Sequence, residues 1–449
     1  MKRRLSFKEY VYVASMLFGL FFGAGNLIFP IHMGQMAGSR IWVAFIGMFI
    51  TGVGLPLLGV AALGISKSTG LFDLSSKVCR PYGMFFTCAL YLTIGPFFAI
   101  PRCATVSFTV GLEQIIPETA NLKLWLLGFS AAFFAAALFF SLRPGKILTW
   151  VGKILNPCFL VFLGILVFTA LSAPGSLSEI EPLGGYADSA FFTGFLEGYN
   201  TMDALASLAF GIIVVQVIRG LGVENSDDVA GNTVLSGIFS CLFMGLIYAA
   251  IALVGAYSRS ALAPAENGGV AFAEVAKLHL GTPGLLVLAA TVTLACLKTA
   301  VGLITSCSET FSALFPKLFK YRTWAIIFTI VSFTFANLGL SLILEFSLPV
   351  LMFLYPLAIT LILLSLLGKF FGYDRRVYGW VTGCTLVAAV YDLLYALPAS
   401  VKALLHLEGV IAAIGGVLPF ADVGLGWVCP AAIGLVIGLL LRRLRPAKA

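Results

Sequence analysis

Four charged side chains stand inside stretches of the chain that are otherwise apolar. They are Arg102, Glu197, Asp203 and Lys298, and each lies in a segment long enough to cross a bilayer. A charge in hydrocarbon is costly, so such residues normally face a protein interior or a water-filled path and bind substrates, protons or ions. We therefore expect these residues to take part in binding, ion coupling or charge pairing.

The apolar run at residues 10–33 is interrupted near its middle. The interrupting residues are Gly19, Gly23, Gly25, Asn26 and Pro30. Irregular backbone survives at membrane depth only where it is buried in protein or lines a cavity. Carbonyls that end a first half-helix suit a cation or an ammonium group, and amides that open a second half-helix suit a carboxylate. The alternative is a kinked packing helix, because Gly and Pro are common in transmembrane helices.

A second interruption follows in the segment 190–218. Its polar residues are Glu197, Tyr199, Asn200, Thr201 and Asp203, which fall within seven positions. A short outer loop between two separate helices is the alternative, but the flanking apolar stretches are too short to span a bilayer independently. The pattern favours a second broken helix.

The apolar segment 82–112 contains side chains that could lie near these breaks. Phe97 and Phe98 could form an apolar wall, and Arg102 could pair with Glu197 as an outer gate. That pair could equally be structural, or Arg102 could extend to the membrane surface.

Lys298 lies near the middle of its segment, with Thr299 beside it and Ala295 one turn earlier. A buried ammonium can take the place of a bound cation or carry a proton. A fixed counter-ion to Asp203 or Glu309 is the alternative.

Several classes of function lack the residues that they need. The sequence contains no GxxxxGK[ST], HExxH or GxSxG motif, so we expect neither a nucleotide site nor an enzyme, and no cofactor. Its nine cysteines form no CxxC pair, which argues against a zinc or disulfide framework. The net charge of +8 is explained by membrane topology, so nucleic-acid binding is not indicated.

The elements that position these groups are membrane helices. Of the 449 residues 60% are hydrophobic and 11% charged, with a mean hydropathy of +1.03, and the apolar stretches are too long for barrel strands. We predict twelve spans near 10–31, 41–65, 82–112, 124–141, 147–172, 190–218, 232–257, 283–313, 323–344, 346–368, 377–398 and 424–441. The segment 405–420 is left open as re-entrant or an additional span.

Loop charges agree with this count. If both termini are cytoplasmic, the inner segments hold 21 of the 28 Lys and Arg residues and the outer segments hold five. Such a bias follows the positive-inside rule. It predicts a multi-pass protein of a cytoplasmic membrane.

The two interrupted helices each lead a set of five spans. Because five is odd, the second set enters the membrane from the opposite side, which gives an inverted repeat with a midplane binding site. The predicted units are a first repeat at 1–172, an outer linker at 173–189, a second repeat at 190–368, and two trailing helices with a basic tail at 369–449.

Four stretches resemble the signature sequences of the bacterial branched-chain amino acid:cation symporters. They are FFGAGNLIFP (21–30), IGPFFAIPR (94–102), EGYNTMDALASLAFG (197–211) and LACLKTAVGLITSCSE (294–309). The similarity runs along essentially the whole chain. It implies an all-α, twelve-helix fold of the leucine-transporter (LeuT) type in a bacterial inner membrane. It also implies import of leucine, isoleucine or valine coupled to Na⁺ or H⁺.

The resemblance also implies roles for individual residues. Gly23, Gly25 and Asn26 would hold the substrate carboxylate, and Tyr199, Asn200 and Thr201 would surround its ammonium group. Phe97 and Phe98 would wall the aliphatic side chain. One sodium ion would bind to Asn26, Thr201 and the Phe21 carbonyl, and a second to Thr299 and the carbonyls of Gly19, Phe22 and Ala295.

Lys298 departs from the pattern of sodium-coupled carriers, where a hydroxyl residue is expected. We hypothesise that its ammonium replaces the second sodium, so that transport uses protons or at most one sodium. A carrier of another small solute remains the alternative, and a channel or a structural membrane protein is disfavoured because the polar groups gather at one depth. The bilayer and the amino acid are the only partners implied, and the oligomeric state stays open.

Overall fold

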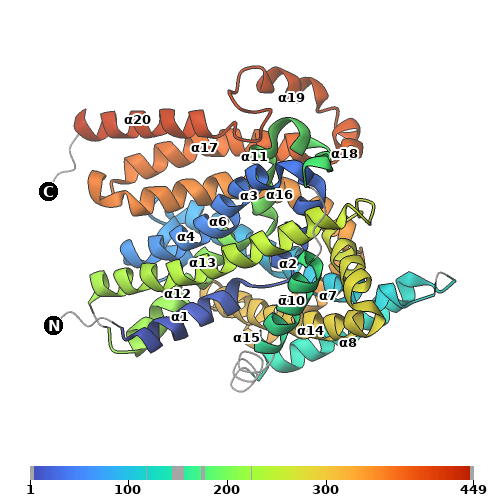
Figure 1. Ribbon diagram of the computed structural model, residues 1–449. Helices are drawn as coiled ribbons and strands as arrows, with labels where there is room; N and C mark the ends of the chain where they lie inside the picture. The colour runs from blue at the N-terminus through green and yellow to red at the C-terminus, as the bar shows by residue number, and fades with distance from the viewer. Residues whose placement is uncertain (1–4, 118, 144–155, 173–176, 224, 445–449) are drawn as a thin grey trace.

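The computed structural model describes residues 5–117, 119–143, 156–172, 177–223 and 225–444. Every regular element in that part of the chain is a helix. Most of the long helices lie roughly along one common axis (Figure 1). The Phe7 end of α1 and the Leu444 end of α20 lie at the same end of the bundle. The predicted all-helical class is confirmed.

In the first part of the chain, residues 22–24 interrupt the first predicted span, and residues 95–98 interrupt the third. In chain order the helices are α1 (Phe7–Phe21), α2 (Gly25–Ala37), η1 (Gly38–Arg40), α3 (Ile41–Phe49), η2 (Ile50–Gly54), α4 (Leu55–Ile65), α5 (Leu71–Ser75), α6 (Arg80–Leu92), η3 (Thr93–Phe97), α7 (Ala99–Val110), η4 (Leu112–Gln114), α8 (Leu122–Ser141) and α10 (Asn156–Leu171). Residues 147–155 of the predicted fifth span lie outside the described residues.

In the second part of the chain, residues 201 and 202 separate α11 from α12. The helices of this part are η6 (Leu177–Glu179), α11 (Gly185–Asn200), α12 (Asp203–Gly220), α13 (Ser226–Ser258), α14 (Gly268–Leu314), α15 (Tyr321–Ala336), α16 (Leu340–Leu366), η7 (Gly368–Phe371), α17 (Arg375–Ala396), α18 (Ala399–Leu404), α19 (Glu408–Gly415) and α20 (Val428–Leu444). Gly281, with φ of +64°, kinks α14, so that only its later part coincides with the predicted span 283–313.

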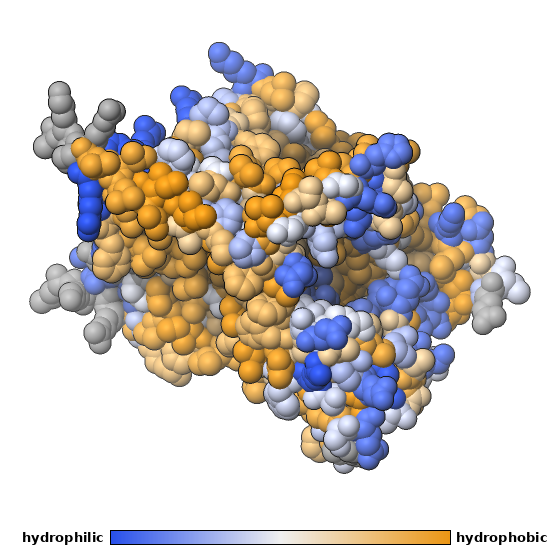
Figure 2. All heavy atoms as spheres, turned by 90° about the horizontal axis from the view of Figure 1, so that it is seen from above, coloured by the Kyte–Doolittle hydropathy of each residue, from blue (hydrophilic) through white to orange (hydrophobic). Residues whose placement is uncertain are grey.

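Seven helical stretches among the described residues are long and apolar enough to cross a membrane. They are Gly25–Ile65, Arg80–Gln114, Leu122–Ser141, Gly231–Ser258, Gly268–Leu314, Leu340–Leu366 and Arg375–Ala396. Large apolar side chains also face outward, among them Phe168 at 76% and Val387 at 75% exposure. Hydrophobic residues cover much of the face in Figure 2, as expected of a surface that meets lipid.

The segment 405–420 contains the short helix α19 and no long helix. Eight residues make a helix of about 12 Å, against a hydrocarbon core of about 30 Å. An additional membrane span at 405–420 is therefore wrong.

Pairs of helices approach each other closely because glycines face neighbouring backbone. A Cβ on Gly34 of α2 would lie 2.0 Å from the Ala252 carbonyl oxygen of α13, and one on Gly255 would lie 2.1 Å from that of Ile31. Small residues at such contacts are typical of membrane helix pairs. Helix α2 is thus held against α13 at backbone distance.

Glycines also allow the two C-terminal helices, α17 and α20, to pack closely. A Cβ on Gly434 of α20 would lie 2.6 Å from the Trp380 carbonyl oxygen, and one on Gly438 would lie 2.8 Å from the Val377 Cα. Both partners belong to α17. These two glycines therefore serve packing within the chain.

Candidate functional site

The first break separates α1 from α2 at residues 22–24. Phe22 leaves helical geometry with φ −71° and ψ 101°, and the Gly23 amide donates to the Asn26 Oδ1 at 2.8 Å. Asn26 therefore satisfies a backbone group that the break would otherwise expose. A Cβ on Gly23 would lie 3.3 Å from the Thr299 Cγ2, so this glycine lets α14 approach the break.

The second break separates α11 from α12 at residues 201 and 202. Met202 has φ of +63°, in the left-handed region that side-chain-bearing residues seldom adopt. The Thr201 hydroxyl donates to the Gly198 carbonyl at 2.9 Å and accepts from the Asp203 amide at 3.3 Å. This hydroxyl bridges the end of one half-helix and the start of the next.

A buried carboxylate connects the two breaks. The Asp203 Oδ2 accepts from the Asn26 Nδ2 at 2.6 Å and from the Tyr248 hydroxyl at 2.9 Å, and the Asn26 amide also bonds to that hydroxyl. Asp203 is 3% exposed. Burying a charge is costly unless hydrogen bonds compensate it, and these bonds do so. They tie α2, α12 and α13 together at one point.

Arg102 reaches the second break from α7. Its Nη1 donates to the Asn200 carbonyl at 2.7 Å and its Nη2 to the Thr201 carbonyl at 3.4 Å. Its guanidinium also lies over the Phe29 ring, 5.1 Å from the centroid. Glu197, its expected partner, instead accepts a hydrogen bond from the Asn200 side chain at 3.2 Å. Arg102 thus contacts the carbonyls that end α11.

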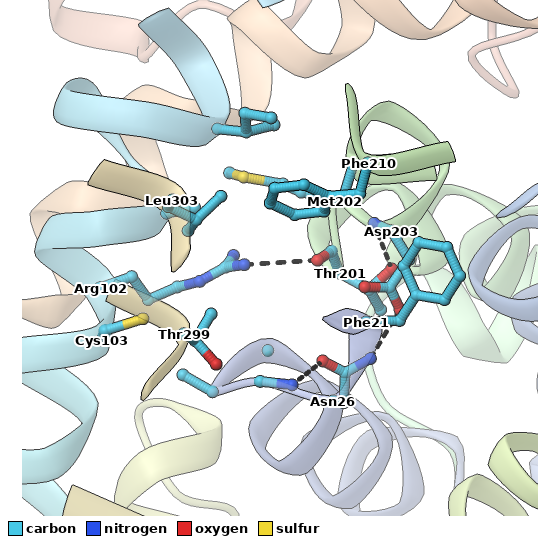
Figure 3. Close-up of a pocket in the computed structure, with 16 residues that line it drawn as sticks. Phe21, Asn26, Arg102, Cys103, Thr201, Met202, Asp203, Phe210, Thr299 and Leu303 are labelled. Atoms are coloured by element: carbon cyan, nitrogen blue, oxygen red, sulfur yellow. Dashed lines mark hydrogen bonds between the residues drawn. The ribbon is translucent and has the colours of Figure 1, made fainter. Parts of the chain in front are cut away.

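A small cavity of about 40 Å³ lies between the two breaks. Figure 3 shows Arg102 and Asp203 on opposite sides of it, with Thr201 between them. The residues that line it are Phe21, Gly23, Ala24, Gly25, Asn26, Ile94, Ala99, Arg102, Cys103, Thr201, Met202, Asp203, Ala206, Phe210, Thr299 and Leu303. One water needs about 10–15 Å³ of such space, so the cavity holds a few waters.

Eight of the residues singled out in the sequence meet at this cavity. They are Phe21, Gly23, Gly25, Asn26, Arg102, Thr201, Asp203 and Thr299. They come from four parts of the chain that are distant in sequence. The structure therefore brings together the candidate carboxylate, ammonium and ion ligands.

Other candidates do not line the cavity. These are Gly19, Phe22, Phe97, Phe98, Glu197, Tyr199, Asn200, Ala295 and Lys298. The Tyr199 ring stacks on Tyr355 with centroids 3.9 Å apart, although the Asn200 carbonyl still points to Arg102. Lys298 is half-buried on α14. Thr299, not Lys298, is the α14 residue that faces the first break.

The expected aromatic wall is displaced. Phe97 packs on Phe335, with centroids 5.2 Å apart, and Phe98 lines a separate apolar cavity. The cause is the η3 turn, where Gly95 adopts φ −95° and ψ −120° and rotates the chain, so that Ile94 and Ala99 line the cavity instead.

Sequence reasoning missed several residues of the site. Tyr248, Ile94, Phe210 and Leu303 were not singled out, because one tyrosine or an aliphatic residue in an apolar span gives no distinctive signal. Tyr248 shares its one signal, a hydroxyl in an apolar span, with Tyr257.

Comparisons with known proteins agree along the chain. Residues 6–445 match the family described as "Branched-chain amino acid transport protein". The "Branched-chain amino acid permease BrnQ" of Lactobacillus delbrueckii subsp. lactis is 50% identical over 434 residues, 96% of each chain. The "Branched-chain amino acid transport system 2 carrier protein" of Pseudomonas aeruginosa is 40% identical over 430 residues, 96% of this chain and 95% of that one.

A solved structure shows the same fold. Mhp1, a nucleobase-cation-symport-1 family transporter in a closed conformation with bromovinylhydantoin bound, superposes with a TM-score of 0.62 at 16% identity. The match covers 98% of this chain and 94% of that one. At this identity the likeness concerns the fold alone, which is LeuT-like. By the family match and these relatives, the chain belongs to the branched-chain amino acid transport protein family, whose members are transporters and not enzymes.

Proposed function

We propose that this protein is a secondary transporter that imports leucine, isoleucine or valine together with a cation, by alternating access around the two breaks. The observation that carries the proposal is the meeting of both breaks at one small cavity, which Asn26, Arg102, Thr201 and Asp203 help to line. Relatives that match over nearly their whole length bear the names of branched-chain amino acid permeases and carriers.

The architecture that we propose for the protein is twelve membrane spans with a 5+5 inverted repeat. Helix packing supports it, because α2 packs on α13 while α12 packs on α4, an exchange of roles between a broken helix and the helix that follows it. Likewise α10 packs on α14 while α16 packs on α7. The proposed units are 1–172, 190–368 and 369–449, with 173–189 as the outer linker.

The size of the cavity supports a site that changes shape, as alternating access requires. A space for a few waters cannot hold a leucine, so the site must enlarge before substrate binds. In the proposed mechanism the two breaks are the flexible points about which half-helices tilt. The distribution of basic residues among the loops supports cytoplasmic termini in a bacterial inner membrane.

For the coupling cation we propose sodium. The support is the position of Thr299, whose methyl and hydroxyl approach Gly23 at the first break and whose hydroxyl donates to the Ala295 carbonyl at 3.2 Å. Carbonyls and hydroxyls are suitable ligands for such an ion. Proton coupling through Lys298 is the alternative.

Uptake into proteoliposomes tests both substrate and cation. We expect labelled leucine to accumulate under an inward sodium gradient without a proton gradient, and Lys298→Met to retain this response. Accumulation driven by protons alone and lost in Lys298→Met would instead establish the alternative. If no branched-chain amino acid accumulates under either gradient, the proposed function is wrong.

A further inference from the structure

Arg102 is a fully charged side chain buried at the centre of the site. It is 4% exposed, and its guanidinium donates hydrogen bonds to two neutral main-chain carbonyls. A buried guanidinium is costly unless its charge is compensated. The carbonyls and the Phe29 ring compensate it in part. The charge is therefore available to attract an anion.

One edge of the guanidinium is poorly occupied. Nη1 makes a short bond of 2.7 Å, whereas Nη2 makes a long one of 3.4 Å. Nε is buried and has no hydrogen-bond partner within the described ranges of the chain. Nε and Nη2 form the same side of the planar group, and such a fork binds a carboxylate through two parallel hydrogen bonds.

The guanidinium lies at the cavity, next to the first break. Arg102 lines the cavity, and its Nη2 is so close to Gly25 that a Cβ there would lie 2.9 Å away. Asp203 stands on the opposite side, where its Oδ2 is already bonded to Asn26 and Tyr248 (Figure 3). A carboxylate is therefore attracted to the Arg102 side and repelled from the Asp203 side.

The first break offers fewer free amides than its sequence suggests. The Gly23 amide already donates to the Asn26 side chain. Of the two glycine amides expected to hold a carboxylate, one is thus engaged within its own turn. A carboxylate at this break needs another donor, and Arg102 is the cationic group that lines the cavity beside it.

We propose that Arg102 binds the carboxylate of the transported amino acid through its Nε and Nη2. The inference rests on the proposed function and extends it, since it makes a residue of α7 the determinant of selectivity for carboxylates. In this structure the guanidinium bonds to the end of α11. On substrate entry Nε and Nη2 take the carboxylate, while Nη1 keeps the Asn200 carbonyl.

The test compares leucine with leucinol, which keeps the side chain and the ammonium group but lacks the carboxylate. Binding of each to the purified full-length protein in detergent gives an affinity ratio. We expect the wild type to bind leucine roughly 100-fold more tightly, as two charge-assisted hydrogen bonds require. In Arg102→Gln leucine should weaken by about that factor and leucinol by less than about threefold, so that the ratio approaches one.

Two further variants separate binding from a structural role. Arg102→Lys keeps the charge but not the fork, and should leave a ratio of about 10-fold. Arg259→Gln is the matched control, because Arg259 also donates to a carbonyl, that of Gln35, but does not line the cavity. Its ratio should equal that of the wild type. Equal weakening of leucine and leucinol in Arg102→Gln would overturn the proposal.

A comparison on the wild type alone covers the case in which Arg102→Gln does not fold. We expect 4-methylpentanoate, a carboxylate without ammonium, to displace labelled leucine at lower concentration than 3-methylbutylamine, the corresponding amine. The reverse order contradicts the role of Arg102. If the wild type binds no branched-chain amino acid, the proposed function itself has failed.

Discussion

The two breaks satisfy their exposed backbone in different ways. At the first break the side chain of Asn26, three residues along, accepts the Gly23 amide. At the second break the carbonyls of Asn200 and Thr201 are satisfied by Arg102, about a hundred residues away in sequence. The first break is therefore closed locally, whereas the second, which the Thr201 hydroxyl also caps locally, depends in addition on a distant helix.

This difference bears on how the site can move. A break that carries its own cap keeps its shape when neighbouring helices shift, whereas a break held by α7 changes when α7 changes. We infer that the second break changes its shape more than the first when neighbouring helices shift. Asp203 links the two breaks through its hydrogen bond from Asn26. Variants at each break test this contrast.

The largest effect should come from crowding the first break. Gly25→Val places a branched side chain where even a Cβ lies 2.9 Å from the Arg102 Nη2. We expect leucine uptake to fall by roughly 100-fold, because overpacking here should cost about 3 kcal/mol. Gly379→Val is the control, since a Cβ there meets nothing within 4 Å. Near-normal uptake by Gly25→Val would contradict the described closeness of the two groups.

A smaller loss should follow removal of the charge that links the breaks. Asp203→Asn keeps the shape of the side chain but removes the charge opposite Arg102. We expect uptake to fall by roughly 30-fold, or about 2 kcal/mol. The exposed Asp188 at the start of α11 provides Asp188→Asn as a control without effect. Equal rates for the two variants would show that Asp203 does not connect the breaks.

Removing one hydrogen bond to Asp203 should have a lesser effect still. Tyr248→Phe loses the hydroxyl that donates to Asp203 Oδ2 at 2.9 Å and leaves the ring in place. A loss of about 1 kcal/mol predicts roughly fivefold slower uptake. Tyr12, which is 59% exposed, gives Tyr12→Phe as the comparison. A 100-fold loss in Tyr248→Phe would mean that the hydroxyl takes part in coupling itself.

The smallest effect concerns selectivity on the α12 side of the cavity. Phe210 lines the cavity and Phe98 does not. We expect Phe210→Leu to change the ratio of leucine to valine uptake by roughly threefold, within the discrimination that about one methylene supplies. Phe98→Leu should leave the ratio within about twofold. A larger change from Phe98→Leu would contradict this assignment and support the aromatic wall that the sequence predicts.

The helical class and the positions of both breaks could be predicted from the sequence. Glycine and asparagine at 23–26 and the polar run at 197–203 have local signatures, because the backbone there must leave helical geometry. The ends of most helices also agree with the apolar ranges to within a few residues.

What could not be predicted depends on rotation and on distant contacts. A turn of π-helix at η3 decides that Ile94 rather than Phe97 faces the cavity, and no local pattern fixes that rotation. The partners of Arg102 and Asp203 are brought together only by packing of α2, α7, α12 and α13. Charges inside apolar segments identified the residues but not their partners.

Counterflow of labelled leucine tests the central claim most directly. Proteoliposomes that contain the wild-type protein are loaded with unlabelled leucine and diluted into labelled leucine, with equal ion concentrations on both sides. A site that alternates between the two faces predicts a transient accumulation of label that saturates with outer leucine and is lost in Gly25→Val. Passive equilibration without overshoot, or equal exchange in Gly25→Val, would contradict transport through a single site at the two breaks.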